Sequence, residues 1–216
     1  MLEKMSAFFE ARLNGYDAHM LNEIDSAKEF YTLTAQNLPQ EKNCHILDLG
    51  CGTGLELEFY LKYNPTAKIT GIDLSQGMLE ALKAKLSTYT ITLIQGSYFD
   101  LPLGENGYNA AVSVESLHHF TQNEKIPLYQ KLHRSLKKDG YFILTDYIAA
   151  SDEDEILFRR TYETLKQEQG ITDHDFYHYD TPLTVAHEIE ALQTAGFSSV
   201  EILSSWGNTY TLKART

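Results

Sequence analysis

The length, composition and charge of the chain exclude several classes of protein. Its 216 residues, 43% of them hydrophobic and only five of them proline, suffice for one sizeable core and are not typical of disordered, collagen-like or disulfide-stabilised proteins. The formal net charge of −12 repels the phosphate backbone of nucleic acids, so we expect no nucleic-acid partner. The spacing of Cys44 and Cys51 does not suggest a disulfide, and no signal peptide or membrane span is evident, which predicts a reduced, cytoplasmic protein without membrane contact.

Apolar runs alternate with amphipathic segments along most of the chain, which is typical of βαβ units. This pattern predicts strands at 45–49, 68–73, 90–95, 109–114 and 141–146. Helices are predicted at 54–63, 75–86 and 122–137, the last beginning with a capping box of Thr121 and Glu124 and followed by a turn at Asp139-Gly140. A helix at 184–195 then precedes two strands, at 199–203 and 209–214, that we expect to be antiparallel.

These elements predict an α/β fold with a mostly parallel sheet. No linker or repeat divides the chain, so we expect residues 1–216 to form a single domain. Two segments do not follow the alternating pattern. We therefore interpret residues 1–40 as a helical cap and residues 147–181 as a cap insertion.

A glycine-rich turn follows the first predicted strand, in the sequence ILDLGCGTG at 46–54. Gly50, Gly52 and Gly54 bring backbone N–H groups and a helix start close to a ligand. The third glycine comes one position earlier than in the dinucleotide pattern G-x-G-x-x-G, and Asp48 would repel a pyrophosphate. S-adenosylmethionine, with its ammonium and sulfonium groups, suits this turn better. Asp73, which ends the next strand, can accept hydrogen bonds from ribose hydroxyls, as it also would in an NAD site.

These residues resemble the first two motifs of class I S-adenosylmethionine-dependent methyltransferases. The segments at 95–102 and 108–120 are similar to the third and fourth motifs, so the resemblance covers about residues 44–148. It implies a Rossmann-like, seven-stranded sheet of order 3-2-1-4-5-7-6, with S-adenosylmethionine as cofactor and S-adenosylhomocysteine as product. Ser97 stands where relatives usually place an Asp that contacts adenine, and Asp100 is a possible substitute. The cofactor site implied in this way consists of Asp48, Gly50, Cys51, Gly52, Gly54, Asp73, Leu74, Met78, Ser97, Tyr98, Glu115 and Tyr16.

Methyl transfer is an in-line displacement that needs a base only where the acceptor must lose a proton. His118 and His119 follow the fourth strand and are candidate bases, although such a pair also serves packing. Candidate acceptor contacts are Tyr147, at the end of the fifth strand, and Tyr177 and Tyr179, in the polar and aromatic segment at 173–180.

That segment also contains His174 and His178, which have the i, i+4 spacing of metal ligands on a helix. The surrounding Gly, Asp and Pro residues disfavour a helix there, so we expect no metal.

The sequence thus predicts a methyltransferase of a small-molecule acceptor, as a monomer or homodimer. The alternatives are a methyltransferase of tRNA or protein, a nicotinamide-dependent oxidoreductase, and a protein that binds the cofactor without turnover or processes it differently.

Overall fold

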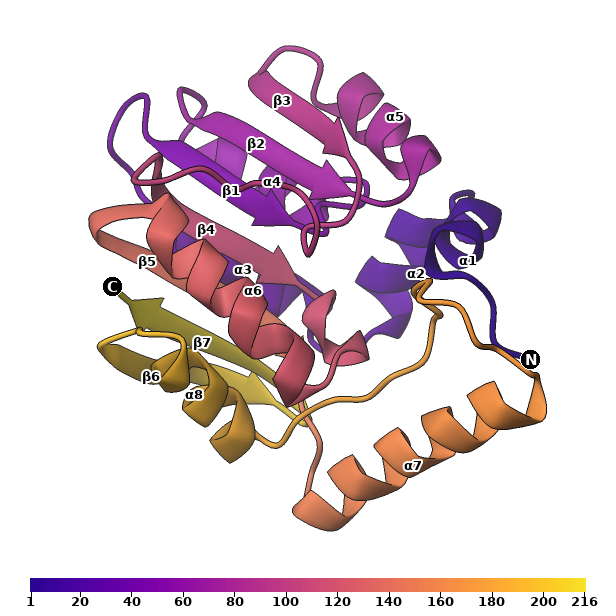
Figure 1. The fold of residues 1–216 in the computed structure, drawn as a ribbon. Coiled ribbons are helices and arrows are strands. Elements are labelled where there is room, and N and C mark those ends of the chain that lie inside the picture. The colour runs from indigo at the N-terminus through magenta and orange to yellow at the C-terminus, as the bar shows by residue number, and fades with distance from the viewer.

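A seven-stranded sheet forms the centre of the molecule (Figure 1), in a computed structural model that describes residues 1–216. The strand order is β3-β2-β1-β4-β5-β7-β6, which confirms the predicted order. The first five strands are parallel, and β7 is antiparallel to both β5 and β6. The strands are β1 (His45–Leu49), β2 (Lys68–Asp73), β3 (Thr90–Gln95), β4 (Tyr108–Val114), β5 (Leu136–Tyr147), β6 (Ser199–Trp206) and β7 (Thr209–Arg215).

Helices cover both faces of the sheet, which explains why consecutive residues of its central strands are buried. Alternate residues of β1 point to opposite faces: Ile46 joins the core under α3 and α4, whereas Leu47 joins the core under α6 and α8. The helices are α1 (Met5–Arg12), α2 (Tyr16–Glu23), α3 (Ala27–Asn37), α4 (Leu55–Tyr63), α5 (Gln76–Lys85), the 3₁₀ turn η1 (Leu117–His119), α6 (Gln122–Ser135), α7 (Asp152–Glu168) and α8 (Val185–Thr194). None of them is long and apolar enough to cross a membrane.

The fifth strand differs most from its predicted bounds. Helix α6 begins with the predicted capping box but ends at Ser135, and β5 begins at once, five residues earlier than expected. Asp139-Gly140 forms an irregularity inside this strand instead of a turn before it: Asp139 has φ 66°, and the pairing with β4 shifts between Tyr108 and Ala110.

Helices α1 and α2 lie at the carboxyl ends of the parallel strands, where an open α/β sheet binds its ligands (Figure 1). Helix α3, also within the predicted cap range, packs instead against α4 and contributes five buried residues to the core. In the range 147–181, α7 has no buried residue, and the segment after it pairs with the N-terminus: the Met5 N–H donates to the Phe176 carbonyl at 2.8 Å, and the His178 N–H donates to the Glu3 carbonyl at 2.9 Å. The cap therefore combines α1, α2 and residues 176–180.

Candidate active site

The glycine turn leads from β1 into α4 and lies against the end of β2, with no room for a Cβ at Gly50 or Gly54. Gly50 has φ 76°, and a Cβ added there would lie 2.1 Å from Ser116 Oγ. Gly54, with φ 75°, precedes α4, and its Cβ would lie 2.8 Å from the Leu82 side chain. Asp73 fixes the turn from the next strand, because Oδ2 accepts from the Gly52 N–H at 2.8 Å and Oδ1 accepts from the Ser75 N–H at 2.8 Å.

A narrow slot lies between this turn and the cap. Its cavity volume of about 50 Å³ is far below the roughly 300–1,000 Å³ of ligand pockets, so the cap must move to admit a nucleoside. The slot is lined by Met5, Phe9, Tyr16, Gly50, Gly52, Asp73, Leu74, Met78, Tyr98, Val114, Glu115, Ser116 and His119.

Two carboxylates of the cap hold it against this slot. Glu10 on α1 accepts from Ser75 Oγ at 2.7 Å, at the N-terminus of α5. Asp17 on α2 accepts from Thr53 Oγ1 and pairs with Lys85 Nζ, each at 2.5 Å. Both contacts reach the elements that follow β1 and β2, so opening the cap breaks polar interactions as well as aromatic packing.

The loop after β3 is held by an ammonium group. Lys131 Nζ on α6 donates to the backbone carbonyls of Tyr98, Phe99 and Leu101 at 2.6, 2.7 and 2.8 Å. The hydroxyl of Ser97, which the resemblance assigns to adenine, accepts from the Phe99 N–H at 3.1 Å. The position of this loop therefore depends on Lys131, which lies at least 30 residues later in the sequence.

Asp48 lies beneath the turn and not in the slot. It is fully buried, and neither of its carboxyl oxygens has an N–H or hydroxyl donor. Its carboxyl group instead lies close to that of Glu56, which is 5% exposed. Burial, and the nearby carboxyl of Glu56, raise the pKa of Asp48 well above its ordinary value. Two buried carboxyl groups without another donor hold a proton between them.

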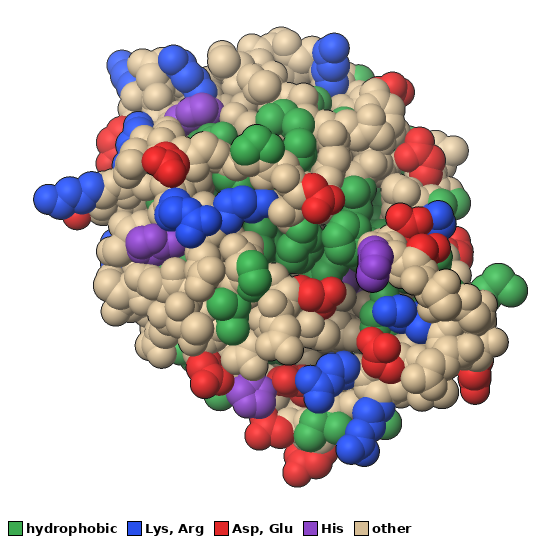
Figure 2. All heavy atoms as spheres, viewed as in Figure 1, with side chains coloured by type: hydrophobic (Ala, Val, Ile, Leu, Met, Phe, Trp, Pro, Cys, Tyr) green, Lys and Arg blue, Asp and Glu red, His purple; other side chains and the backbone are tan.

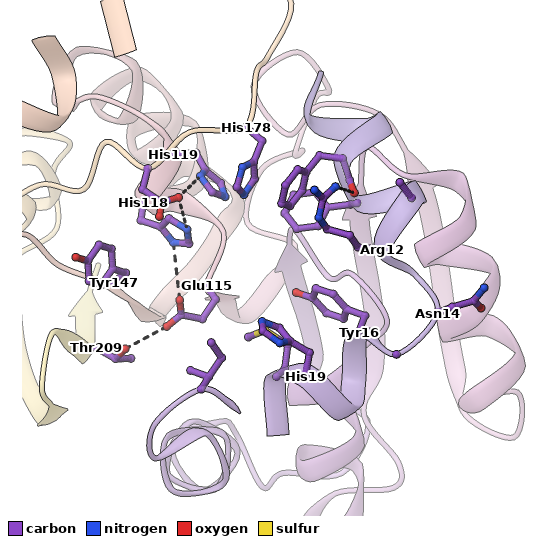
Figure 3. Close-up of a pocket in the computed structure, with 17 residues that line it drawn as sticks. Arg12, Asn14, Tyr16, His19, Glu115, His118, His119, Tyr147, His178 and Thr209 are labelled. Atoms are coloured by element: carbon purple, nitrogen blue, oxygen red, sulfur yellow. Dashed lines mark hydrogen bonds and ion pairs between the residues drawn. The ribbon is translucent and has the colours of Figure 1, made fainter. Parts of the chain in front are cut away.

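A second and larger cavity, of about 770 Å³, adjoins the slot (Figure 3). Phe9, Tyr16, Glu115 and His119 line both cavities, so the two meet at these side chains. Figure 3 shows Arg12, Tyr16 and His19 of the cap on one side and Glu115, His118, Tyr147 and Thr209 of the strand ends on the other. The remaining lining residues are Phe8, Ala11, Asn14, Gly15, Met20, Ile24, His178 and Asp180.

The two adjacent histidines have opposite electrostatic surroundings. His118 Nδ1 lies 2.5 Å from Asp146 Oδ1, and although burial opposes the charged ring, this carboxylate raises the pKa of His118 to about 9. His119 Nδ1 lies 3.2 Å from both the Tyr179 carbonyl and Asp180 Oδ1. Burial, together with the charge on His118, lowers the pKa of His119 to about 4. At neutral pH His118 is therefore cationic and His119 is neutral.

Asp180 connects these rings, since its Oδ1 also lies 3.5 Å from His118 Nε2. Although burial favours its neutral form, the hydrogen bond with His119 and the charge on His118 lower the pKa of Asp180 to about 2. The ligand atoms of His118, His119 and Asp180 lie within 4.8 Å of one another, a spacing that can hold a metal ion. Because these atoms already pair with one another and with Asp146, we interpret the cluster as a hydrogen-bonded network of titratable side chains.

Several of the predicted site residues meet at the two cavities. Those that line one or both are Tyr16, Gly50, Gly52, Asp73, Leu74, Met78, Tyr98, Glu115, His118, His119 and Tyr147. Those outside both linings are Asp48, Cys51, Gly54, Ser97, Tyr177 and Tyr179. Cys51 and Gly54 belong to the glycine turn but do not line either cavity. The Tyr177 hydroxyl donates to Asp173, and the Tyr179 ring stacks on that of Tyr162. The roles of all these residues stay predictions.

The sequence did not single out several residues of the larger cavity. Phe8, Phe9 and Thr209 were not predicted as site residues, and Asp180 was noted only as the last residue of the polar and aromatic segment at 173–180. The stacking of Phe8 on His178, with ring centres 3.5 Å apart, joins segments 170 residues apart. The adjacent aromatic residues Phe8 and Phe9 near the N-terminus are the sequence signal that could have indicated this wall.

Comparison with known proteins agrees with the motifs. Residues 46–140 match a family model described as a methyltransferase domain. The chain is 31% identical to the carboxy-S-adenosyl-L-methionine synthase of Wolinella succinogenes, over 83% of this chain and 78% of that protein. It is 29% identical to the malonyl-[acyl-carrier protein] O-methyltransferase of Priestia megaterium, over 64% of this chain and 49% of that protein.

A solved structure shares the fold. Human N-acetylserotonin methyltransferase, in complex with S-adenosylmethionine, superposes with a TM-score of 0.64 at 21% identity, over 91% of this chain and 53% of that one. The motifs, the strand order and these relatives together identify an enzyme whose cofactor is S-adenosylmethionine. The chain belongs to the class I S-adenosylmethionine-dependent methyltransferases.

Proposed function

We propose that this enzyme transfers the methyl group of S-adenosylmethionine to a small-molecule acceptor in the larger cavity. The observation that carries the proposal is that the two cavities meet at Phe9, Tyr16, Glu115 and His119, which line both. In-line displacement at the sulfonium requires the acceptor atom within about 3–3.5 Å of the methyl carbon, with water excluded. A cofactor in the slot would present its methyl group at this junction.

The slot supplies a partner for each part of the cofactor. In this proposal Asp73 accepts from the ribose hydroxyls, and Met78 and Tyr98 contact the adenine ring. The turn at Gly50 and Gly52 receives the amino-acid end of the cofactor. Gly52 has open space where a Cβ would stand, which supports a close approach of ligand to backbone.

The walls of the larger cavity favour a compact acceptor. Phe8 and Phe9 of the cap and Tyr147 of β5 offer aromatic faces to the cavity. On the molecular face shown in Figure 2, lysine and arginine side chains are interspersed with acidic ones. With a formal net charge of −12, this distribution supports a small molecule over tRNA as substrate.

A second candidate is the synthesis of a carboxylated S-adenosylmethionine. The similarity to a carboxy-S-adenosyl-L-methionine synthase over most of both chains favours it. The charge of the cavity argues against it, because a new carboxylate near the sulfonium would meet Glu115 and Asp180. Arg12, the only arginine that lines this cavity, holds its guanidinium 3.6 Å from the centre of the Phe8 ring.

Product analysis separates these functions. The enzyme is incubated with S-adenosylmethionine and a panel of phenols, amines and carboxylic acids, and the cofactor-derived product is identified by mass spectrometry. S-adenosylhomocysteine formed in equal amount with a methylated acceptor is the expected result, and Glu201→Gln, on the distant strand β6, serves as the active control. A carboxylated cofactor would establish the second candidate instead. Cofactor binding without either product would contradict both.

A further inference from the structure

Glu115 differs from the other acidic residues of the site in its position. It is the only carboxylate residue that lines both cavities. It directly follows β4 and has φ 50°, a conformation that is uncommon for a residue with a side chain and concentrates at functional sites. In Figure 3 its carboxylate lies between the strand ends and the cap residues Tyr16 and His19.

The Glu115 carboxylate has few partners of its own. Its side chain is 14% exposed, Thr209 Oγ1 donates to its Oε1 at a long 3.4 Å, and its Oε2 lies 4.0 Å from His118 Nδ1. That nitrogen is already bound to Asp146 at 2.5 Å. Lone pairs of Glu115 are therefore free toward the cavity. The titratable and polar groups that face it are Tyr16 and His19 from α2, His118 from η1, Asp146 from β5, Asp180 from the segment before α8, and Thr209 from β7.

Neither histidine is suited to remove a proton from the acceptor. His118 carries its proton already at neutral pH, because the Asp146 carboxylate, against the effect of burial, raises its pKa to about 9. His119 has a free pair of electrons but is a weak base, because burial and the charge on His118 lower its pKa to about 4. Its Nδ1 is also held by the Tyr179 carbonyl.

We propose that Glu115 is the general base of the methyl transfer, an inference that rests on the proposed function. The acceptor's lone pair attacks the methyl carbon, the bond from sulfur to carbon breaks, and the electron pair stays on sulfur to give S-adenosylhomocysteine. The proton of the acceptor's O–H or N–H goes to the Glu115 carboxylate and then to water when the cavity opens. The acceptor is therefore a hydroxyl or amine compound that must lose a proton.

The electrostatic surroundings of Glu115 support this role. Burial, with the negative charges of Asp146 and Asp180, raises the pKa of Glu115 to about 7, even though the charge on His118 lowers it. A base with a pKa near the operating pH combines a useful fraction of the ionised form with enough driving force to take the proton. The cationic His118 then has a positioning role, since it balances Asp146 and Asp180 beside the reacting groups.

Glu115→Gln tests the proposal, because glutamine keeps the shape and the backbone conformation but cannot accept a proton. We expect kcat for an acceptor that loses a proton, such as a phenol or primary amine, to fall by at least about 100-fold. For the matching thioether or tertiary amine, which loses none, kcat should fall less than about threefold, a threshold well below the effect of losing a general base. Affinity for S-adenosylhomocysteine, measured by calorimetry, should likewise stay within about threefold, as it should in the control Glu201→Gln.

Two results would overturn the proposal. One is a loss of cofactor binding in Glu115→Gln, which would make Glu115 a cofactor ligand only. The other is equal loss of rate, or no loss, with both kinds of acceptor. A measurement without any acceptor completes the test: the ¹³C-carboxyl NMR signal that disappears in Glu115→Gln should titrate near pH 7, and titration at the ordinary value of glutamate would refute the assignment. Absence of methyl product from the wild type would instead contradict the proposed function.

Discussion

Replacement of Asp73 by asparagine should weaken cofactor binding strongly while leaving the fold intact. The Asp73 carboxylate holds the Gly52 and Ser75 N–H groups, each at 2.8 Å, and in our account it also accepts from the ribose. Asparagine has only one carbonyl oxygen, so at least one of these bonds to a charged acceptor is lost, at a cost of about 1.5–3 kcal/mol. Affinity for S-adenosylhomocysteine should therefore fall roughly 10- to 150-fold.

Calorimetric titration with S-adenosylhomocysteine measures this loss, and urea unfolding measures stability on the same samples. We expect the free energy of unfolding to fall by about 1–3 kcal/mol, because a backbone N–H of the turn loses its partner. Asp139→Asn is a matched control, because Asp139 lies at the distant start of β5 in a left-handed conformation that asparagine tolerates. An affinity of Asp73→Asn within about threefold of the wild type would refute the ribose assignment, since it leaves no room for a lost charged hydrogen bond.

Three further substitutions test separate parts of the site. Glu56→Gln gives the buried Asp48 carboxyl group a hydrogen-bond donor. Because the pKa of Asp48 is raised in the folded state, its protonated form stabilises the fold below about pH 4, and this contribution is lost as pH rises. The variant should therefore be more stable than the wild type at about pH 8 in urea unfolding, and the same pH dependence of stability in both proteins would contradict this. Lys131→Met removes the donor to the carbonyls of the loop after β3 and should weaken S-adenosylhomocysteine binding about tenfold in calorimetry. Unchanged affinity would show that the loop keeps its conformation without Lys131. Asp146→Asn should lower the NMR titration midpoint of His118 from about 9 to near or below its ordinary 6.5. The pair stabilises the fold fully below about pH 6.5 and loses this contribution as pH rises through 9, so an unmoved midpoint would exclude Asp146 as the cause.

Local patterns sufficed to predict the sheet. The bounds of β1, β2 and β3 agree with the sequence prediction, because each is a short apolar run between a helix and a turn. The glycine turn and Asp73 could be connected for the same reason, since strand ends of a parallel sheet meet at one edge. The early start of β5 was missed because its first residues, with lysines and an Asp-Gly pair, are typical of a turn.

Contacts between distant segments could not be predicted. Asp180 reaches His118 and His119 because residues 176–178 pair with the N-terminus and the Thr181 N–H donates to the His118 carbonyl at 2.8 Å, and no periodicity encodes these contacts. Asp48 was predicted as a cofactor ligand from its position before the turn, whereas Glu56, the carboxyl group close to it, lies in the first turn of the next helix. Burial of that pair depends on the packed core, which composition alone does not describe.

A crystal structure with bound S-adenosylhomocysteine tests the central claim most directly. We predict the ribose hydroxyls on the Asp73 carboxylate, adenine against Met78 and Tyr98, and the sulfur at the junction beside Glu115, facing the larger cavity. The cap helices α1 and α2 should shift to widen the slot. A cofactor bound elsewhere, or with its sulfur turned away from the cavity that Glu115 lines, would contradict the account.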